Sequence, residues 1–258
     1  MRLRVFASGS KGNCLAVSSG ASSILVDLGL SCRETLARMK ACAFDPSRLA
    51  GVLFTHDHAD HCSGAATFRK RFPSVPFYAN GATADAVEAR SGVSGGWKLF
   101  ETASSFDAGG FSVTAFSVPH DAADTVGYLI SDGEKNLFVA TDFGCVTSSV
   151  RDAFSRADAA VLESNHDMAL LSGSNRPWSL KQRIAGRSGH LSNDGAADLV
   201  RSAASPRLKI LLLAHLSEEC NASRLALETA KEACSAAGLA DIPVEALSQN
   251  EPSRLYVF

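Results

Sequence analysis

The chain has 258 residues, of which 46% are hydrophobic and 20% are charged, and its formal net charge is −2. This is the balance of an ordinary globular protein that buries a sizeable core, and it excludes a strong overall attraction to nucleic acid or to an anionic membrane. No apolar run approaches the length of a membrane-spanning helix, and the N-terminal stretch MRLRVFASGSKGNC lacks the apolar segment of a signal peptide. The seven cysteines include no CxxC pair, which predicts reduced thiols in a cytoplasmic protein. The small net charge and the lack of a spanning segment predict no membrane partner.

The first half of the chain predicts strands followed by helices. RLRVFAS is typical of a strand, CLAVSS and SILVDLG of a hairpin, and AGVLFT of a buried strand. Ser31 and Glu34 form a capping-box pattern, so we expect a helix to begin there. Further helices are expected around residues 62–72 and 81–91.

The second half repeats this order of elements. FSVTAFSVPH alternates like a strand, and VGYLIS and NLFVATD flank Asp132-Gly133, a dipeptide typical of a hairpin turn. AAVLES and KILLLAH predict further strands, and VEALS and RLYVF are candidate closing strands. Helices are expected near residues 147–157, 179–185, 194–204 and 221–237. The pattern predicts central sheets with helices outside, and the absence of a Pro/Ser-rich linker predicts one domain over residues 1–258.

Five polar side chains stand where predicted strands end. They are Asp27, His56, His120, Asp142 and His215. In layered sheet folds, ligand sites gather at strand ends, because the sheet is rigid there and the loops are free to vary. We therefore expect these five positions to converge on one edge of a pair of sheets.

The segment VLFTHDHADH crowds His56, Asp57, His58, Asp60 and His61 into one short stretch, although the chain has only seven histidines. Imidazole and carboxylate are the ligands of zinc, manganese and iron. The first two histidines can turn to one ion, and the following Asp-His pair to a second. Two ions need about eight ligand positions, and ions about 3.5–4 Å apart with a bridging hydroxide form a hydrolytic centre. Asp57 has no place in this set, and we expect it to be a solvated loop residue.

The string THDHADH resembles the HxHxDH motif of the metallo-β-lactamase superfamily. Asp27 in VDLG, His120 in VPHD, Asp142 in ATDFG and His215 in LAHLS resemble its first, third, fourth and fifth motifs, in the same order. The resemblance runs from residue 4 to about residue 220. It implies an α/β fold, the αββα four-layer metallo-β-lactamase sandwich, with the metals at one edge.

Longer strings narrow this resemblance. ASGSKGNC, LESNHD, GHLSN and LAHLSEECN together resemble the bacterial YycJ/WalJ (VicX) group, whose members are described as DNA exonuclease-like. The pattern is also similar to ribonuclease Z, which shares the N-terminal sheet start and the HLS-type fifth motif. The resemblance implies a metal-dependent hydrolase, and a phosphodiesterase or nuclease with DNA favoured over RNA as its substrate.

We assign the ligands to two divalent ions, zinc or manganese, with iron as a further possibility. His56, His58 and His120 are the expected ligands of one ion. Asp60, His61 and His215 are the expected ligands of the second ion, and Asp142 is expected to bridge the two ions. Asp60 also has a catalytic role, because it can orient the hydroxide. Asp27 is not expected to be a metal ligand. Its carboxylate is expected either to accept a hydrogen bond from a metal-bound histidine, through the ring nitrogen that does not bind the metal, or to brace the loop.

Other residues are candidates for catalysis and substrate binding. His190 in SGHLSN is the candidate general acid, because protonation of a leaving group needs a group that is not bound to metal; the alternative is a capping or core histidine. His166 in ESNHD is a candidate substrate contact close to Glu163. The Gly- and Ser-rich loop with Ser10 and Asn13 is a candidate contact for an anionic substrate, although such a loop also forms a hairpin turn.

The segment 167–194 is basic. It has no acidic residue between its first and last positions and leads to the candidate general acid; its basic residues are Arg176, Lys181, Arg183 and Arg187. A basic stretch beside a metal centre suits a phosphate backbone, so we interpret these residues as contacts to nucleic acid. The alternative is a solvated charged helix face.

Two other functions remain open at this point. A small-molecule hydrolase of the glyoxalase II type, acting on a thioester or lactone, would use the same metal ligands, and the basic segment argues against it. A non-catalytic scaffold that keeps the fold would be expected to lose ligands, and the intact set argues against that. The sequence does not predict an oligomeric state.

Overall fold

The strands of the chain form two seven-stranded sheets in the computed structural model, which describes residues 1–258. The first sheet has the order β14-β1-β2-β3-β4-β5-β6. Its strands from β14 to β3 pair antiparallel, and those from β3 to β6 pair parallel. Their bounds are β1 Arg2–Ala7, β2 Cys14–Ser19, β3 Ser22–Val26, β4 Leu49–Leu53, β5 Phe77–Ala79, β6 Trp97–Leu99 and β14 Tyr256–Val257.

The second sheet has the order β13-β12-β11-β10-β9-β8-β7. β7 with β8 and β9 with β10 pair antiparallel, whereas the strands from β10 to β13 pair parallel. Their bounds are β7 Ser105–Ala108, β8 Phe111–Ser117, β9 Val126–Ser131, β10 Asn136–Ala140, β11 Ala159–Glu163, β12 Ile210–Ala214 and β13 Val244–Ala246. Both sheets therefore pass from antiparallel hairpins to parallel strands, and the carboxyl ends of parallel neighbours share one edge.

Contacts between Cα atoms group the chain into two compact units. The first unit holds residues 1–115, 122–126 and 248–257, and the second holds residues 116–121, 127–247 and 258. The expectation that residues 1–258 form a single domain stays a prediction.

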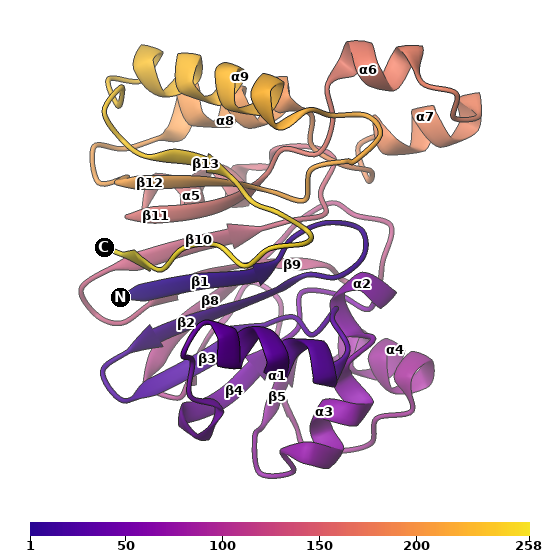
Figure 1. The fold of residues 1–258 in the computed structure, drawn as a ribbon, viewed down its shortest axis with the longest axis vertical. Coiled ribbons are helices and arrows are strands. Elements are labelled where there is room, and N and C mark those ends of the chain that lie inside the picture. Colours follow the sequence, from indigo (N-terminus) through magenta and orange to yellow (C-terminus); the bar gives the residue numbers. More distant parts are fainter. The chain divides into compact units, whose positions relative to one another are not determined.

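Helices of the first unit cover its sheet. In Figure 1, α1 lies along β2 and β3. A core of buried apolar residues, among them Met39, Phe54, Phe68 and Phe77, joins these helices to the sheet. The rings of Phe54 and Phe77 meet edge to face at 5.0 Å. The helices are α1 Cys32–Ala41, the 3₁₀ helix η1 Pro46–Arg48, α2 Ala59–Cys62, α3 Ala65–Arg71 and α4 Gly81–Ser91.

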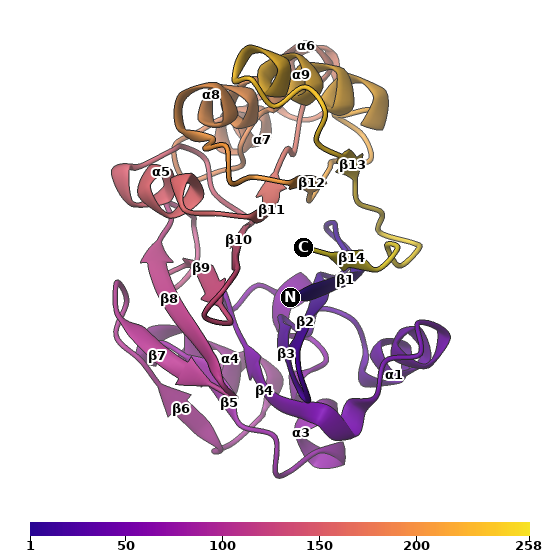
Figure 2. The ribbon, with the colours of Figure 1, turned by 90° about the vertical axis from the view of Figure 1, so that its left-hand side faces the viewer.

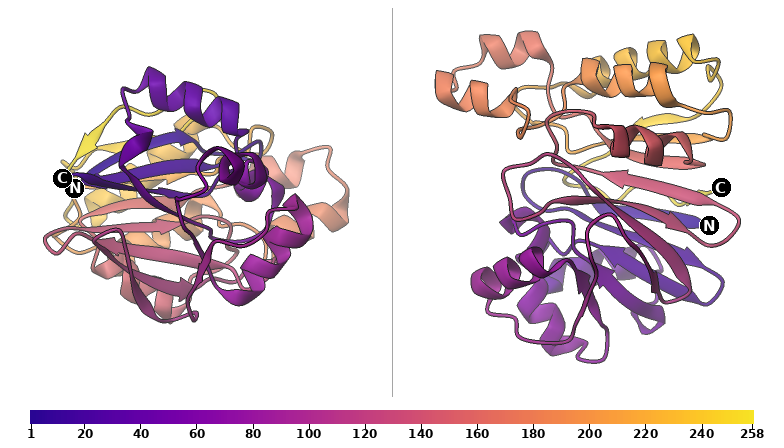
Figure 3. Two further views of the ribbon diagram at one scale, coloured as in Figure 1. Left: turned by 90° about the horizontal axis from the view of Figure 1, so that it is seen from below. Right: turned by 180° about the vertical axis from the view of Figure 1, so that it is seen from behind.

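Helices of the second unit pack on β10 to β13. Figures 1 and 2 show α5, α8 and α9 along one side of these strands, and their core includes Phe138, Phe154 and Leu199. The pair α6 and α7 extends beyond them in Figure 3 and has a small cluster of its own around Leu171 and Ile184. The helices are α5 Ser148–Ser155, α6 Met168–Gly173, α7 Trp178–Ile184, α8 Asn193–Ala203 and α9 Ser223–Ala236. None of the helices combines the length and the hydropathy that a bilayer crossing needs.

Most of the predicted elements are confirmed. Ser31 caps α1, and its side chain accepts a hydrogen bond from Glu34 N at 3.2 Å. The Asp132-Gly133 hairpin joins β9 to β10. The sequence did not predict β5, β6, β7 and α6. The three strands have three or four residues each, too few to establish a period, and α6 begins after Asp167 inside a stretch that reads as polar loop.

Candidate metal centre

Two strand ends of the first unit meet through Asp27. Asp27 follows β3, Thr55 lies just beyond β4, and the two strands are parallel neighbours. The Asp27 carboxylate accepts hydrogen bonds from the Thr55 backbone N and from Thr55 Oγ1, both at 2.9 Å. Asp27 has a left-handed backbone with φ of 62°, a conformation that is costly for a non-glycine residue. This strained turn holds the carboxylate against the neighbouring strand end.

The Asp27 carboxylate determines which ring nitrogen carries the proton in two histidines, directly for His61 and through Thr55 for His56. His61 Nδ1 lies 2.7 Å from Asp27 Oδ2, so Nδ1 carries the proton and Nε2 carries the lone pair. The Asn13 amide nitrogen lies 2.9 Å from His61 Nε2 and donates to that lone pair. Because Thr55 Oγ1 donates to Asp27, it accepts from His56 Nδ1 at 3.0 Å, which leaves the lone pair of His56 on Nε2. Both rings are therefore in the form in which imidazole binds metal.

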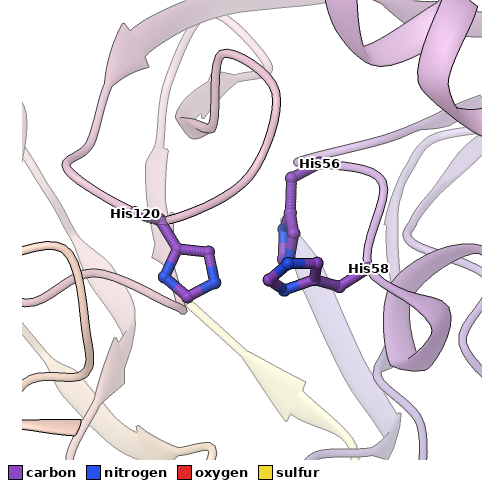
Figure 4. Close-up of side chains that lie close together, drawn as sticks. All are labelled: His56, His58 and His120. Atoms are coloured by element: carbon purple, nitrogen blue, oxygen red, sulfur yellow. The ribbon is translucent and has the colours of Figure 1, made fainter. Parts of the chain in front are cut away.

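The loop after β4 gathers the four predicted ligands of the first unit. The ring centroid of His56 lies 4.8 Å from that of His58 and 4.1 Å from that of His61. Figure 4 shows the rings of His56 and His58 beside each other on this loop. Asp60, in the first turn of α2, places Oδ2 3.6 Å from His61 Nε2. Three imidazoles and one carboxylate are the donors that zinc and similar cations prefer.

The Gly- and Ser-rich loop between β1 and β2 supports the histidine loop. Asn13 N donates to Asp60 O at 2.7 Å, and Asn13 O accepts from Gly29 N at 2.9 Å. Gly29 permits this approach because a Cβ at its position would lie 1.7 Å from Asp60 O. Asn13, predicted as a substrate contact, is 6% exposed and makes these internal contacts, whereas Ser10 is exposed.

Gln249 holds the other side of the β1–β2 loop. Its Oε1 accepts from Lys11 N at 2.8 Å, and its Nε2 donates to Gly12 O at 3.0 Å. The Gln249 backbone oxygen accepts from Arg38 Nη1 at 3.1 Å, which ties it to α1. The loop beside the predicted ligands is thus fixed from both sides.

The expectation that Asp57 is a solvated loop residue is wrong. Asp57 is 8% exposed, and its carboxylate accepts from Arg90 Nη2 at 3.0 Å and from Ala123 N at 3.1 Å. Burial alone would raise the pKa of Asp57, but the hydrogen bonds from Arg90 and Ala123 and the charge of Arg90 hold it below its usual range. Asp57 therefore pins the histidine loop to α4 and to the segment before β9.

In the second unit, three parallel strands end in polar residues. Asp142 follows β10, Glu163 is the last residue of β11, and His215 follows β12. Asp142 and His215 have positive φ values of 58° and 54°. The donor atoms of these three residues and of His190 all lie within 4.8 Å of one another. Strand pairing therefore assembles a cluster of two carboxylates and two imidazoles.

Glu163 is the hub of this cluster. Its Oε1 accepts from His190 Nδ1 at 2.8 Å and from His215 Nδ1 at 3.1 Å, and its Oε2 accepts from the backbone N of Phe143 at 2.8 Å and of Leu191 at 3.3 Å. Burial of the fully enclosed carboxylate would raise its pKa, but the charge of His190 and the hydrogen bonds from both histidines lower the pKa of Glu163. Since both its oxygens are used, Glu163 holds the histidines in place, and the Nε2 of His215 keeps its lone pair.

His190 differs from His215 in exposure, and its surroundings raise its pKa. Its side chain is 23% exposed, more than that of His215 at 3%. Burial alone would lower the pKa of His190, but the Glu163 carboxylate, its hydrogen bond and Asp142 raise that pKa. His120, which Figure 4 also labels, points its Nδ1 at Gly189 O at 3.1 Å, so its Nε2 holds the lone pair.

Sequence reasoning gave Glu163 no role of its own. The sequence did contain an indication of such a role. Glu163 ends the apolar run AAVLE, much as Asp142 follows the apolar run NLFVA. A carboxylate at the end of a buried strand needs hydrogen-bond donors, so polar partners could have been expected. The sequence does not show that Glu163 of β11 pairs with Ala214 of β12. This parallel register places Glu163 beside His215, the residue that follows Ala214.

The predicted substrate contacts have mixed surroundings. His166 is 1% exposed, neither of its ring nitrogens makes a hydrogen bond, and burial lowers its pKa. Arg176 Nη2 pairs with Glu219 at 2.9 Å, and Arg183 Nε pairs with Asp121 at 2.6 Å. Lys181 Nζ donates to the Ser172 backbone oxygen at 2.6 Å, and Arg187 is exposed. Acidic partners from outside the segment therefore offset part of its positive charge.

Comparison with known proteins places this arrangement in a family. A family model described as "Beta-lactamase superfamily domain" matches residues 22–215, from β3 through His215. The chain belongs to the metallo-β-lactamase superfamily. The exodeoxyribonuclease YycJ of Bacillus anthracis is 35% identical over 228 residues, which cover 88% of this chain and 86% of that protein. The predicted relation to the YycJ group is confirmed, and divalent metal ions are the cofactors that this superfamily fold and donor set imply.

Solved structures of other proteins show the same fold. The metallo-β-lactamase fold protein YhfI from Bacillus subtilis is 19% identical, with 98% of both chains covered and a TM-score of 0.70. The short form of human tRNase Z is 15% identical, with 100% of both chains covered and a TM-score of 0.67. The predicted fold class, the αββα metallo-β-lactamase sandwich, is confirmed.

The Asp57–Arg90 pair provides a test of how the histidine loop is fixed. Asp57→Ala should lower the free energy of unfolding by about 1–3 kcal/mol, because Ala123 N and Arg90 lose their acceptor. Arg90→Gln should cost less, since the backbone bond remains. Urea unfolding of both variants and of the double variant, with chelator present to remove metal linkage, measures the coupling. Additive losses would contradict the pairing.

Proposed function

We propose that this protein is a metal-dependent phosphodiesterase that removes nucleotides from DNA ends. The observation that carries the proposal is the 35% identity to an exodeoxyribonuclease across 88% of the chain. The chemistry of each unit supports it, because each presents buried imidazoles in the metal-binding form beside carboxylates. We also propose that residues 1–258 act as one domain, since the family match runs through both units. The seven free cysteines suit a reducing cytoplasm.

The proposed metal assignment is the one that the sequence motifs predict. We propose that His56, His58 and His120 bind one ion. Asp60, His61 and His215 bind the other, and Asp142 binds both. Two divalent ions, zinc or manganese, would supply a water of lowered pKa as the nucleophile and positive charge for the phosphate. Asp27 and Glu163 fit this assignment, because each takes the Nδ1 proton of a proposed ligand and leaves Nε2 for metal. Asp60 would orient the nucleophile.

His190 is the proposed general acid. Glu163 holds its Nδ1, so the free Nε2–H of the protonated ring is the group that can reach a leaving oxygen. Its pKa is raised by Glu163 and Asp142 against the effect of burial, which keeps the ring protonated closer to neutral pH. Glu163 acts through His190 and is therefore a positioning residue.

The basic segment is the proposed contact for the flanking strand. Lys181 and Arg187 make no ion pair with a carboxylate in the structure, so their charges are the most available to phosphates. Arg176 and Arg183 would have to share their acidic partners with the substrate. Trp178, which is 69% exposed at the start of α7, offers a face on which a base of single-stranded DNA can stack.

Metal content tests the ligand assignment. Chelator-free protein should contain two divalent ions per chain, and Asp142→Asn should lose at least one, because it removes the shared carboxylate. Elemental analysis by mass spectrometry is the measurement. Asp85→Asn, an exposed carboxylate on α4, is the matched control and should keep both ions. Wild-type protein with almost no metal would sink the assignment.

The role of His190 is separable from metal binding. His190→Ala should keep both ions and lose roughly 10²–10⁴-fold in the rate of DNA hydrolysis, the usual worth of general acid catalysis. A chromogenic diester whose nitrophenolate leaves without protonation should be affected much less. Loss of metal from His190→Ala, or equal losses on both substrates, would argue that His190 is a ligand or a structural residue.

The basic segment should contribute to the binding of DNA and not to the binding of a small substrate. Changing Lys181 and Arg187 together to Gln should raise the KM for DNA and flatten its salt dependence, because fewer counterions are released on binding. Turnover of the chromogenic diester should change little. Lys231→Gln, an exposed charge on α9, is the control. Steady-state kinetics at several salt concentrations measure both effects. Faster turnover of RNA or of a thioester than of DNA would contradict the proposed substrate.

A further inference from the structure

A hollow of about 130 Å³ lies in the first unit, at the strand ends opposite the histidine loop. Strand register builds its floor, because Arg2 pairs with Ser18, Ser18 pairs with Ser23, and Arg4 pairs with Ala16. Paired residues point to the same face of a sheet, so both arginines stand on the face that α1 covers. α1 ends at residue 41, and the turn after it closes one wall of the hollow.

Three arginines and one aspartate supply the charge of this hollow. Arg4 Nη1 donates to Ser253 O at 2.7 Å, and Arg48 donates to backbone oxygens of the β2–β3 turn. These hydrogen-bond partners are neutral carbonyls that orient the two guanidinium groups, and the nearby Asp45 carboxylate offsets part of the charge of Arg48. Arg2 is exposed at the rim. The Asp45 carboxylate accepts hydrogen bonds from Ser47 N at 2.9 Å and Oγ at 2.7 Å.

The chemistry of the lining selects one class of ligand. Guanidinium groups match the oxygens of phosphate and bind them with two hydrogen bonds each. Phe44 and Leu255 add an apolar side, and the Phe44 ring is held edge-on against Phe6 at 5.7 Å. A continuous nucleic-acid backbone needs basic residues in succession, whereas these three arginines surround a single small hollow.

We propose that this hollow binds a small phosphate monoester. Arg2, Arg4 and Arg48 hold the phosphate group, and the organic group lies against Phe44. The site is separate from the proposed metal centre, because its residues stand at the amino ends of β1, β3 and β4 and at the carboxyl end of β2. It goes beyond the proposed nuclease function and does not depend on it.

Titration with phenylphosphonate, a monoester mimic that is not hydrolysed, tests this site. Calorimetry on metal-loaded wild-type, Arg2→Glu and Arg33→Glu proteins compares the hollow with a matched exposed arginine on α1. Binding at a metal centre is common to all three proteins, so a difference reports the hollow. Arg2→Glu should weaken one binding event by about tenfold or more, because a charge-assisted contact becomes a repulsion, and Arg33→Glu should not. Arg2→Gln, which removes charge without reversing it, should give a smaller loss in the same direction.

Two outcomes would overturn the proposal. Equal phosphonate binding by wild-type and Arg2→Glu protein would show that the hollow takes no phosphate. Unchanged phosphonate binding with a raised KM for DNA in Arg2→Glu would make Arg2 a contact for nucleic acid. Circular dichroism and hydrolysis of the chromogenic diester confirm that each variant is folded, and none of the three substitutions is at a residue proposed for catalysis.

Discussion

A buried carboxylate that accepts the Nδ1 proton of a histidine is the interaction on which both units depend. Asp27 does this for His61, and Glu163 does it for His215 and His190. An isolated carboxylate in the core would be costly, so each of the two also takes backbone N–H donors from the adjoining strand end or turn. The carboxylates thereby set the orientation and the tautomer of the rings before any ion arrives, which is the preorganisation that a tight metal site needs.

Backbone strain marks the same positions. Asp27, Asp142 and His215 are three of the six non-glycine residues with positive φ. Asp27 and His215 directly follow a strand, and Asp142 lies two residues after the end of β10. A left-handed residue at that point turns the chain away from the sheet while its side chain remains at the edge. Such conformations persist only where surrounding contacts over-determine them, and here the hydrogen bonds of the carboxylates and the parallel pairing do so.

The fold and the crowding of histidines on one loop could be predicted from the sequence because both are encoded locally. HDHADH lies within six positions, and each strand-end residue follows its own apolar run. What it could not predict are pairings between distant residues. Asp57 lies 33 positions from Arg90, and Arg183 lies 62 from Asp121, so neither the burial of the first nor the partial neutralisation of the second is visible in a local window. The role of Glu163 was missed for the same reason, since its histidine partners come from two later segments.

The contacts of residues 248–257 have a consequence for the order of events during synthesis. Gln249 holds the loop that ends in Asn13, Ser253 bonds to β1, and β14 extends the same sheet. The two bonding partners Gln249 and Gly12 are 237 positions apart. A ribosome therefore exposes the histidine loop long before it makes the segment that steadies the support of that loop. The first sheet completes its pairing only after residue 257 is made, so a nascent chain carries the clustered histidines before the contacts that steady their loop exist.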